Sequence, residues 1–242
     1  MKAIILSAGK GTRVKGINDK IPKVLLPILN KPMLNWNIDL LKRYGITKIA
    51  INTHHLSEKI KSYLGDGSKF GVNIKYSYEL ELLGTSGALN NFKKFFDDVF
   101  VVIYGDVISN INLEKLVKFH KKHGGTATLV VHESSHPKDS DIVQMDKNNK
   151  VINFVHKPRN RDFGTLGNAA LYVVDPIIFK YLPEGKSDFI QDIFQKMIKN
   201  GEQIYGYKTE EFIKDAGTPE RLTQVQQDLK KEKEFNNNND NL

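Results

Sequence analysis

The loop after the first apolar run of the chain gathers glycine, hydroxyl and basic residues. Residues 3–6 are typical of a buried strand, and residues 7–13 read Ser-Ala-Gly-Lys-Gly-Thr-Arg. Glycines let backbone N–H groups face a phosphate with no Cβ in the way. Arg13 and Lys23 would add fixed positive charge. We therefore predict a triphosphate-binding loop, whose nucleotide contacts we assign to Leu6, Ala8, Gly9, Gly11 and Thr12.

Two glycines after a strand are also compatible with a purely structural tight turn. The loop is not a Walker loop, because no Gly-Lys-Ser/Thr follows four residues after a glycine, and it lacks the full dinucleotide fingerprint. The phosphate interpretation therefore depends on Arg13 and on Lys23, which follows ten residues later in Ile-Pro-Lys-Val.

Two aspartates near the ends of apolar strands are candidates for a magnesium site. Asp106 follows the apolar run 99–104 in the sequence Tyr-Gly-Asp, and Asp215 follows the run 212–214. Ligands of open α/β sheets collect outside the carboxyl ends of the strands, and carboxylate oxygens are hard ligands for Mg²⁺. The alternatives are a loop cap for Asp106 and a turn residue for Asp215.

Six motifs occur in the order found in the sugar-1-phosphate nucleotidylyltransferases, the enzymes that make NDP-sugars. The chain resembles that family from residue 1 to about residue 228. The motifs are the opening loop with Pro22-Lys23, Leu-Gly-Thr-Ser-Gly-Ala at 83–88, Tyr-Gly-Asp at 104–106, Phe-Val-His-Lys-Pro at 154–158, Gly-Asn-Ala-Ala-Leu-Tyr at 167–172 and Lys-Asp-Ala-Gly-Thr-Pro-Glu at 214–220.

The resemblance implies that a sugar phosphate oxygen attacks the α-phosphorus of a nucleoside triphosphate and that pyrophosphate leaves. Both reactants are anions, so such a protein mainly positions them and neutralises their charge. As catalytic residues, Arg13 is assigned to the leaving pyrophosphate and Lys23 to the α-phosphate. Mg²⁺ is the implied cofactor, held by Asp106 and Asp215. The other implied nucleotide contacts are Glu79, Gly84, Thr85 and Asp106.

The sugar half departs from the family pattern at three positions. His156 stands where the family usually has glutamate, Asp141 replaces a glycine, and Ala170 replaces a second glycine. The phosphate half is intact, so the class of reaction is better defined than the sugar. The residues assigned to the sugar phosphate and the sugar are Lys157, Asn168, His156 and Asp141.

The base is assigned from Glu79, which aligns where many relatives have a glutamine that pairs with uracil or thymine. A carboxylate only accepts hydrogen bonds and therefore suits the N–H donors of guanine. This favours GTP with heptose or mannose 1-phosphate, as in the guanylyltransferases that the motifs resemble. The alternative is UTP with N-acetylglucosamine or hexose 1-phosphate. A different class remains open, namely a non-catalytic regulatory homologue that binds a nucleotide or a sugar.

Apolar strands alternate with helical patterns through the first half of the chain, which favours βαβ units and a parallel sheet. The resemblance implies the Rossmann-like nucleotidyltransferase fold, an α/β fold with a doubly wound, mostly parallel sheet, and a small added β region for the sugar. One domain is expected over residues 1–228, and the charged and then Asn-rich residues 229–242 are expected to be disordered. The expected strands are 3–6, 48–53, 72–79, 99–104, 126–132, 142–146, 151–155, 169–174, 204–208 and 212–214.

The composition restricts the partners. The net charge is +8, but the lysines are spread along the chain without the aromatic-interleaved basic stripe of single-strand binders, so no nucleic acid is expected. Zero cysteines exclude disulfides and thiolate metal sites. No apolar run reaches the roughly 18–20 residues of a membrane span, and the first run is too short for a signal peptide. We expect a cytoplasmic protein without membrane contacts that binds a nucleoside triphosphate and a sugar 1-phosphate; a homo-oligomer is compatible with the family.

Overall fold

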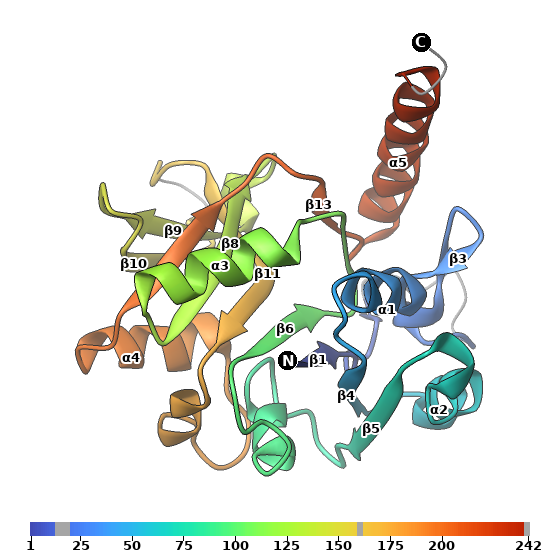
Figure 1. Cartoon of the computed structure of the whole chain (residues 1–242), viewed down its shortest axis with the longest axis horizontal. Helices are drawn as coiled ribbons and strands as arrows, with labels where there is room; N and C mark the ends of the chain where they lie inside the picture. The colour runs from blue at the N-terminus through green and yellow to red at the C-terminus, as the bar shows by residue number, and fades with distance from the viewer. Residues whose placement is uncertain (13–19, 159–161, 240–242) are drawn as a thin grey trace.

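The computed structural model describes residues 1–12, 20–158 and 162–239 (Figure 1). Within these residues, nine strands form one large sheet, ordered β10-β9-β11-β6-β1-β4-β5, with β8 pairing β11 and β12 pairing β8. Two small sheets pair β2 with β3 and β7 with β13. The strands are β1 (Lys2–Leu6), β2 (Pro27–Ile28), β3 (Lys31–Pro32), β4 (Lys48–Thr53), β5 (Asn73–Tyr78), β6 (Phe100–Tyr104), β7 (Val107–Ser109), β8 (Ala127–Glu133), β9 (Asp141–Met145), β10 (Val151–His156), β11 (Leu166–Val174), β12 (Ile204–Lys208) and β13 (Ile213–Asp215).

Helices cover both faces of the large sheet, so the predicted α/β, doubly wound class is confirmed. The α-helices are α1 (Met33–Arg43), α2 (Ser57–Leu64), α3 (Leu113–His123), α4 (Gln195–Lys199) and α5 (Pro219–Asn239). The shorter helical turns are η2 (Lys23–Leu25), η3 (Ser68–Phe70), η4 (Gly87–Phe92), η5 (Pro137–Asp139), η6 (Pro176–Lys180) and the π-helical η7 (Phe189–Phe194).

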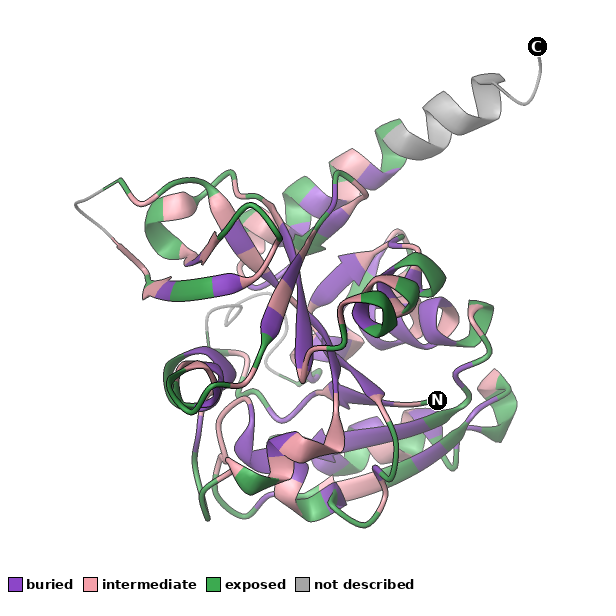
Figure 2. Ribbon diagram, turned by 60° about the vertical axis from the view of Figure 1, so that its left-hand side comes forward, coloured by how far each residue is buried: buried purple, intermediate pink, exposed green. Residues whose placement is uncertain are grey.

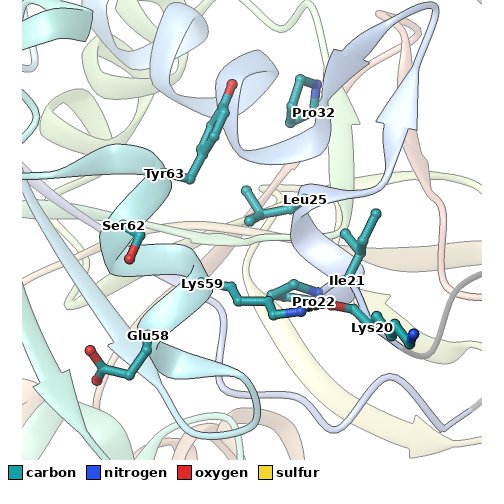
Figure 3. A pocket seen from close by; sticks show the side chains of 9 residues that line it. All are labelled: Lys20, Ile21, Pro22, Leu25, Pro32, Glu58, Lys59, Ser62 and Tyr63. Atoms are coloured by element: carbon teal, nitrogen blue, oxygen red, sulfur yellow. Dashed lines mark hydrogen bonds between the residues drawn. The ribbon is translucent and has the colours of Figure 1, made fainter.

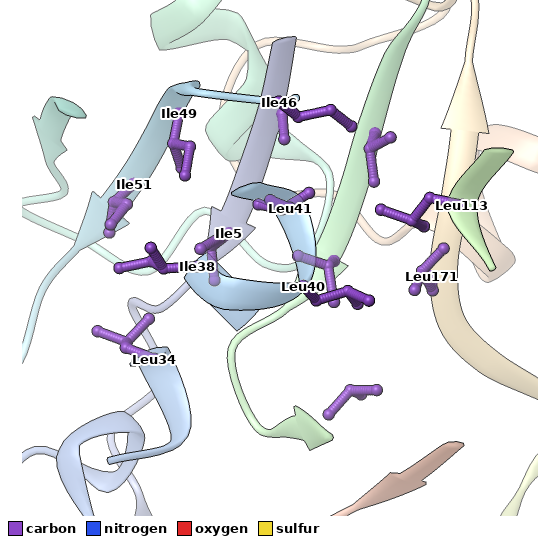
Figure 4. Packing of buried hydrophobic residues seen from close by; sticks show 14 of the residues in the cluster. Ile5, Leu34, Ile38, Leu40, Leu41, Ile46, Ile49, Ile51, Leu113 and Leu171 are labelled. Atoms are coloured by element: carbon purple, nitrogen blue, oxygen red, sulfur yellow. The ribbon is translucent and has the colours of Figure 1, made fainter. Parts of the chain in front are cut away.

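Strands β6, β1, β4 and β5 run parallel to one another, and the apolar residues of the three inner strands, β6, β1 and β4, are buried on both faces (Figure 2). Successive side chains alternate between the two faces. Ile5 packs with helix α1, including Leu34 and Ile38 (Figure 4). Ile4 belongs to the apolar cluster on the other side, together with Phe92 of η4. A run without polar alternation is the pattern of a parallel strand that helices cover on both faces.

The second half of the large sheet is the predicted β region. Here β11 pairs antiparallel with β6, β8 and β9, and β9 and β10 form a hairpin. The hairpin turns at residues 146–149, where the Asp146 carboxylate accepts hydrogen bonds from the backbone of Asn148 and Lys150. Asn149 takes a left-handed conformation, with φ of 64°, which asparagine tolerates in tight turns.

Helix α5 differs from the expectation for the end of the chain. It begins at Pro219 after Thr218, as predicted, but its helical backbone continues to Asn239 through the region expected to be disordered. Leu222, Val225 and Leu229 recur at helical spacing and are buried against Ile28 and its neighbours. The exposed Glu220, Gln224, Gln227, Lys230 and Lys231 are good helix formers. Among the described residues, no helix is long and apolar enough to cross a membrane.

Candidate functional site

A cavity of about 400 Å³ lies at the carboxyl ends of β1, β4 and β6. These ends coincide because Leu6 pairs with Asn52 on one side and with Tyr104 on the other. Most of the predicted nucleotide residues line this cavity, namely Leu6, Ala8, Gly9, Gly11, Thr12, Lys23, Gly84, Thr85 and Asp106. The structure therefore brings together motifs that lie up to about 100 residues apart in the sequence.

A second hollow, of about 590 Å³, is more open and lies between helix α2 and residues 20–25 (Figure 3). Its walls are formed by Pro22, Leu25, Pro32 and Tyr63 with a few charged side chains at the edge. Although it is larger, it contains neither the glycine loop nor the aspartate motifs. We therefore place the functional site in the cavity at the strand ends.

In the glycine loop, residues 7–12, no Cβ covers the backbone at Gly9 and Gly11, which both line the cavity. A Cβ placed on Gly9 would meet no atom within 4 Å, so packing does not require a glycine there and an anion can approach the backbone. Gly11 has φ of 64°, in the left-handed region. At Gly105, in contrast, close packing requires glycine, because a Cβ there would lie 2.9 Å from the Leu6 carbonyl oxygen. Arg13, the predicted pyrophosphate residue, lies outside the described residues.

Lys23 and Asp106 form an ion pair on the cavity wall. Their side chains are only 11% and 22% exposed, so water screens the pair less than a surface pair. Lys23 begins η2, and Asp106 lies in the two-residue connection between the end of β6 at Tyr104 and the start of β7 at Val107. Within this pair each side chain neutralises the charge of the other.

Backbone pairing brings the segments that contain Asp215 and Asp106 next to each other. Strand β13 pairs with β7 so that Asp215 is opposite Val107, and the Ala216 N–H donates to the Asp106 carbonyl at 2.8 Å. The Asp215 carboxylate accepts from the Gly217 N–H and from Arg221 Nη1, both at 2.8 Å. Its side chain is not on the cavity wall, although Gly217 is.

The described residues contain no group of three or more His, Cys, Asp or Glu side chains arranged to hold a metal. Two aspartates on neighbouring backbone segments nevertheless suit Mg²⁺, which is commonly bound by one or two carboxylates together with substrate phosphates and water. The carboxylate oxygens of Asp106 and Asp215 are thus of the chemical kind that Mg²⁺ prefers.

The loop that contains Gly84 and Thr85 packs against residues 185–188. A Cβ on Gly84 would lie 2.3 Å from the Ser187 carbonyl oxygen, which explains the glycine by close approach. The Thr85 hydroxyl donates to the Asp188 carboxylate at 2.8 Å and accepts from the Phe189 N–H at 3.0 Å. This hydroxyl therefore joins two segments of the chain, in addition to its place on the cavity wall.

Glu79 is placed differently from the expectation of a direct contact with the base. It is 2% exposed and is not among the cavity-lining residues. Its Oε1 accepts from Asn52 Nδ2 at 2.7 Å, and its Oε2 accepts from the Leu83 N–H at 2.9 Å. Asn52, which the sequence interpretation missed, does line the cavity. The signal for Asn52 is a polar residue near the carboxyl end of an apolar parallel strand.

Two of the sugar-half departures contact each other. Asp141 and His156 are opposite residues of the β9–β10 hairpin, and His156 Nδ1 lies 2.6 Å from Asp141 Oδ1. Burial raises the pKa of the Asp141 carboxyl, and the hydrogen bond from His156 opposes this shift. Lys157 Nζ lies 3.9 Å from Asp139 Oδ1. These residues lie outside the wall of the 400 Å³ cavity.

Asn168 uses both ends of its side chain within β11. Its Nδ2 donates to the Tyr172 hydroxyl at 2.9 Å, and its Oδ1 accepts from the Ala170 N–H at 3.1 Å. The pairing of β11 with β8 shifts register between Asn168 and Tyr172, and Ala170 in this irregular segment has φ of 54°. The third departure from the family pattern therefore places an alanine where a glycine is unstrained.

Ala170→Gly is expected to raise the free energy of unfolding by about 0.5–1 kcal/mol. A side chain in the left-handed region costs about 1–2 kcal/mol, and the extra backbone entropy of glycine offsets about half of that. Urea unfolding checks the result, with the neighbouring Ala169→Gly as the control. Ala169 has no positive φ and is buried, so its change should destabilise. Equal destabilisation by both variants would contradict the strain at Ala170.

Arg221 is a further residue that the sequence interpretation missed. Its Nη1 donates to Asp215, and its Nη2 lies 3.1 Å from Asp139 Oδ2. Since Asp139 is also near Lys157, Arg221 connects the second aspartate motif with the predicted sugar half. No sequence pattern singled out this arginine, because its two partners lie six and about 80 residues away.

Comparison with known proteins gives a family and a fold. The profile of the nucleotidyl transferase family matches residues 2–232. A UTP--glucose-1-phosphate uridylyltransferase of Synechocystis is 38% identical over 85% of this chain and 57% of its own length. A mannose-1-phosphate guanylyltransferase of Mycobacterium tuberculosis is 29% identical over 94% of this chain and 64% of its own length. The chain thus spans about three fifths of the length of these curated relatives.

Solved structures agree with this fold over almost their whole length. A Bacillus anthracis structure assigned as a glucose-1-phosphate thymidylyltransferase has a TM-score of 0.85 at 27% identity, and covers 93% of this chain and 94% of its own. HddC from Yersinia pseudotuberculosis, solved with GMP-PN, has a TM-score of 0.80 at 23% identity, over 94% of this chain and 99% of its own. The second likeness concerns the fold alone.

Proposed function

Because the chain belongs to the nucleotidyl transferase family, we propose that it transfers a nucleotidyl group from a nucleoside triphosphate to a sugar 1-phosphate and releases pyrophosphate. The observation that carries this proposal is the Lys23–Asp106 pair, which lines the same cavity as the glycine loop. Such a site holds a cation for phosphate and a carboxylate for a metal at the same place.

In the proposed reaction an oxygen of the sugar phosphate forms a bond to the α-phosphorus, and the bond from that phosphorus to the bridging oxygen of pyrophosphate breaks. The backbone N–H groups of residues 8–12 hold the triphosphate, and Lys23 exchanges Asp106 for an oxygen of the α-phosphate. Arg13 would bind the leaving pyrophosphate. On the sugar side, Lys157 would bind the phosphate of the incoming sugar.

Asp106 and Asp215 would hold Mg²⁺, supported by their neighbouring backbone positions. When bound, the ion supplies positive charge to the phosphate oxygens, which makes the α-phosphorus more electrophilic. Arg221 orients the Asp215 carboxylate, and Lys23 keeps the Asp106 carboxylate paired in the absence of substrate.

Two nucleotides are candidates. GTP with mannose or heptose 1-phosphate is supported by the sequence motifs and by the guanylyltransferases among the relatives. UTP with a hexose 1-phosphate or N-acetylglucosamine 1-phosphate is supported by the 38% identical relative, whose name is that of a uridylyltransferase. The Glu79 carboxylate accepts hydrogen bonds from Asn52 and Leu83. A direct contact between Glu79 and guanine is therefore not an argument for GTP.

A panel of four nucleoside triphosphates against glucose, N-acetylglucosamine, mannose and heptose 1-phosphates tests these candidates through pyrophosphate release with Mg²⁺. We expect turnover with GTP or UTP and with at least one of these sugar phosphates. Binding of a nucleotide without release of pyrophosphate in any combination would favour the non-catalytic regulatory homologue and contradict the proposal.

A further inference from the structure

We propose that Asn52 and Glu79 act as positioning residues, which together hold the glycine loop and the loop of residues 80–85 at a fixed distance from each other. The catalytic consequence rests on the proposed function. In this account Glu79 influences the nucleotide through the two loops and makes no contact with the base.

The hydrogen bonds run through three neighbouring strands, β1, β4 and β5 (Figure 1). The Ser7 N–H, directly after β1, donates to Asn52 Oδ1 of β4 at 2.8 Å. Asn52 Nδ2 donates to Glu79 Oε1 at 2.7 Å, and Glu79, directly after β5, accepts from the Leu83 N–H at 2.9 Å. An unbroken series of three hydrogen bonds thus joins the loops that follow β1 and β5, the two neighbours of β4 in the sheet.

The donors and acceptors allow only one arrangement. The backbone N–H groups of Ser7 and Leu83 can only donate, and a carboxylate at position 79 can only accept. Asn52 must therefore turn its carbonyl oxygen to Ser7 and its amide nitrogen to Glu79. Any residue that lacks one acceptor and one donor at position 52 leaves a buried group without its partner.

Burial makes these bonds hard to replace with water. Asn52 is 1% and Glu79 is 2% exposed. The Glu79 backbone is also fixed, because its N–H donates to the Thr53 carbonyl at 2.8 Å and its carbonyl oxygen lies 2.8 Å from His54 Nδ1. Hydrogen bonds thus hold both the backbone and the carboxylate of Glu79. The carboxylate cannot turn into the cavity without breaking the series.

Both ends of the series act on the cavity wall. Ser7 lines the cavity together with Ala8 and Gly9, and Leu83 lies between Leu82 and Gly84, which form another part of the cavity wall. Loss of the series would let these parts of the wall move apart. Since misplacement of a reacting group by about 1 Å can cost about 100-fold in rate, such a movement is sufficient to affect turnover.

The test exploits the polarity of the series. Glu79→Gln alone brings two N–H donors together, either at Asn52 or at Leu83. Asn52→Asp alone brings two carboxylates together. The double variant N52D/E79Q restores every bond, because the new carboxylate accepts from Ser7 and from the new amide, whose carbonyl oxygen accepts from Leu83. Glu58→Gln, whose side chain is 83% exposed, is the matched control for loss of a negative charge.

We expect each single variant to lower kcat/KM for the nucleotide by about tenfold or more, and the double variant to return within about threefold of the wild type. Hydrogen exchange at the Ser7 and Leu83 amides should accelerate in both single variants and slow again in the double variant. If the single variants fail to fold and the double variant folds, recovery of folding by the second substitution supports the proposal in the same way.

Two results would overturn the proposal. One is a folded double variant whose amide exchange and kinetics are no better than those of the worse single variant. The other is a change of base preference that is equal in the single variant Glu79→Gln and in the double variant. Such a result would assign the base contact to Glu79 itself. If the wild type releases no pyrophosphate, the proposed function fails, while the exchange of the two amides still decides whether the series exists.

Discussion

Asp106→Ala is expected to lower kcat for pyrophosphate release by about two to three orders of magnitude, with the fold intact. The substitution removes the carboxylate that lines the same cavity as the glycine loop and takes away half of the donor set assigned to Mg²⁺. Removal of one electrostatic group of a preorganised site has effects of this size. Steady-state kinetics over a magnesium titration measures the loss, and a urea unfolding curve verifies the fold.

Asp97→Ala is the matched control for Asp106. Asp97 lies just before the opposite end of the same strand, with a side chain that is 74% exposed and paired with Lys2. Its loss should leave kcat unchanged, since an exposed ion pair contributes little. Asp106→Asn keeps the shape but loses the charge, and should be nearly as inactive as the alanine variant. Activity of Asp106→Ala close to that of the wild type would show that the site lies elsewhere.

Lys23→Met is expected to lower kcat by about 100-fold and to leave magnesium binding to the free protein equal or tighter. The two effects differ because Lys23 has two partners in this account. With substrate it neutralises the α-phosphate, and without substrate it neutralises Asp106. Its removal therefore weakens catalysis and at the same time frees the carboxylate for a cation. Kinetics and calorimetric titration with Mg²⁺ measure the two effects separately.

Lys31→Met provides the comparison for Lys23, because Lys31 also pairs with an aspartate, Asp39, but on the surface. This control should change neither kcat nor magnesium binding. If Lys23→Met instead weakened magnesium binding and left kcat intact, Lys23 would have a structural role in holding Asp106 and no role in phosphate binding.

The sequence is sufficient to predict the parallel part of the fold. Strands β1, β4 and β6 are mainly apolar runs, and the alternating residues of β5 also predict a strand. Residues 48–53 are predicted with the bounds that β4 has in the structure. Since the loops that follow parallel strands leave the sheet at one edge, the meeting of the glycine loop with Asp106 also follows from the order of elements. The cavity contains both, as expected.

Side-chain partners could not be predicted, because they depend on register and on packing. His156 and Asp141 lie 15 residues apart, and only the pairing of β10 with β9 makes them neighbours. Likewise, the sequence predicts that Glu79 accepts hydrogen bonds from a base. In the structure its carboxylate instead accepts from Asn52 of β4. The helical backbone beyond residue 229 is a similar case, because the burial of Leu229 depends on a surface made by residues from the start of the chain.

The most direct test of the central claim follows the two ends of the nucleotide separately. Radiolabel in the α-phosphate and, in a parallel reaction, in the γ-phosphate of the preferred triphosphate is traced after incubation with a sugar 1-phosphate and Mg²⁺. We predict that the α-label appears in the NDP-sugar and the γ-label in pyrophosphate, both only when the sugar phosphate is present. Release of the γ-label as orthophosphate, or no movement of either label with any sugar phosphate of the panel, would contradict nucleotidyl transfer.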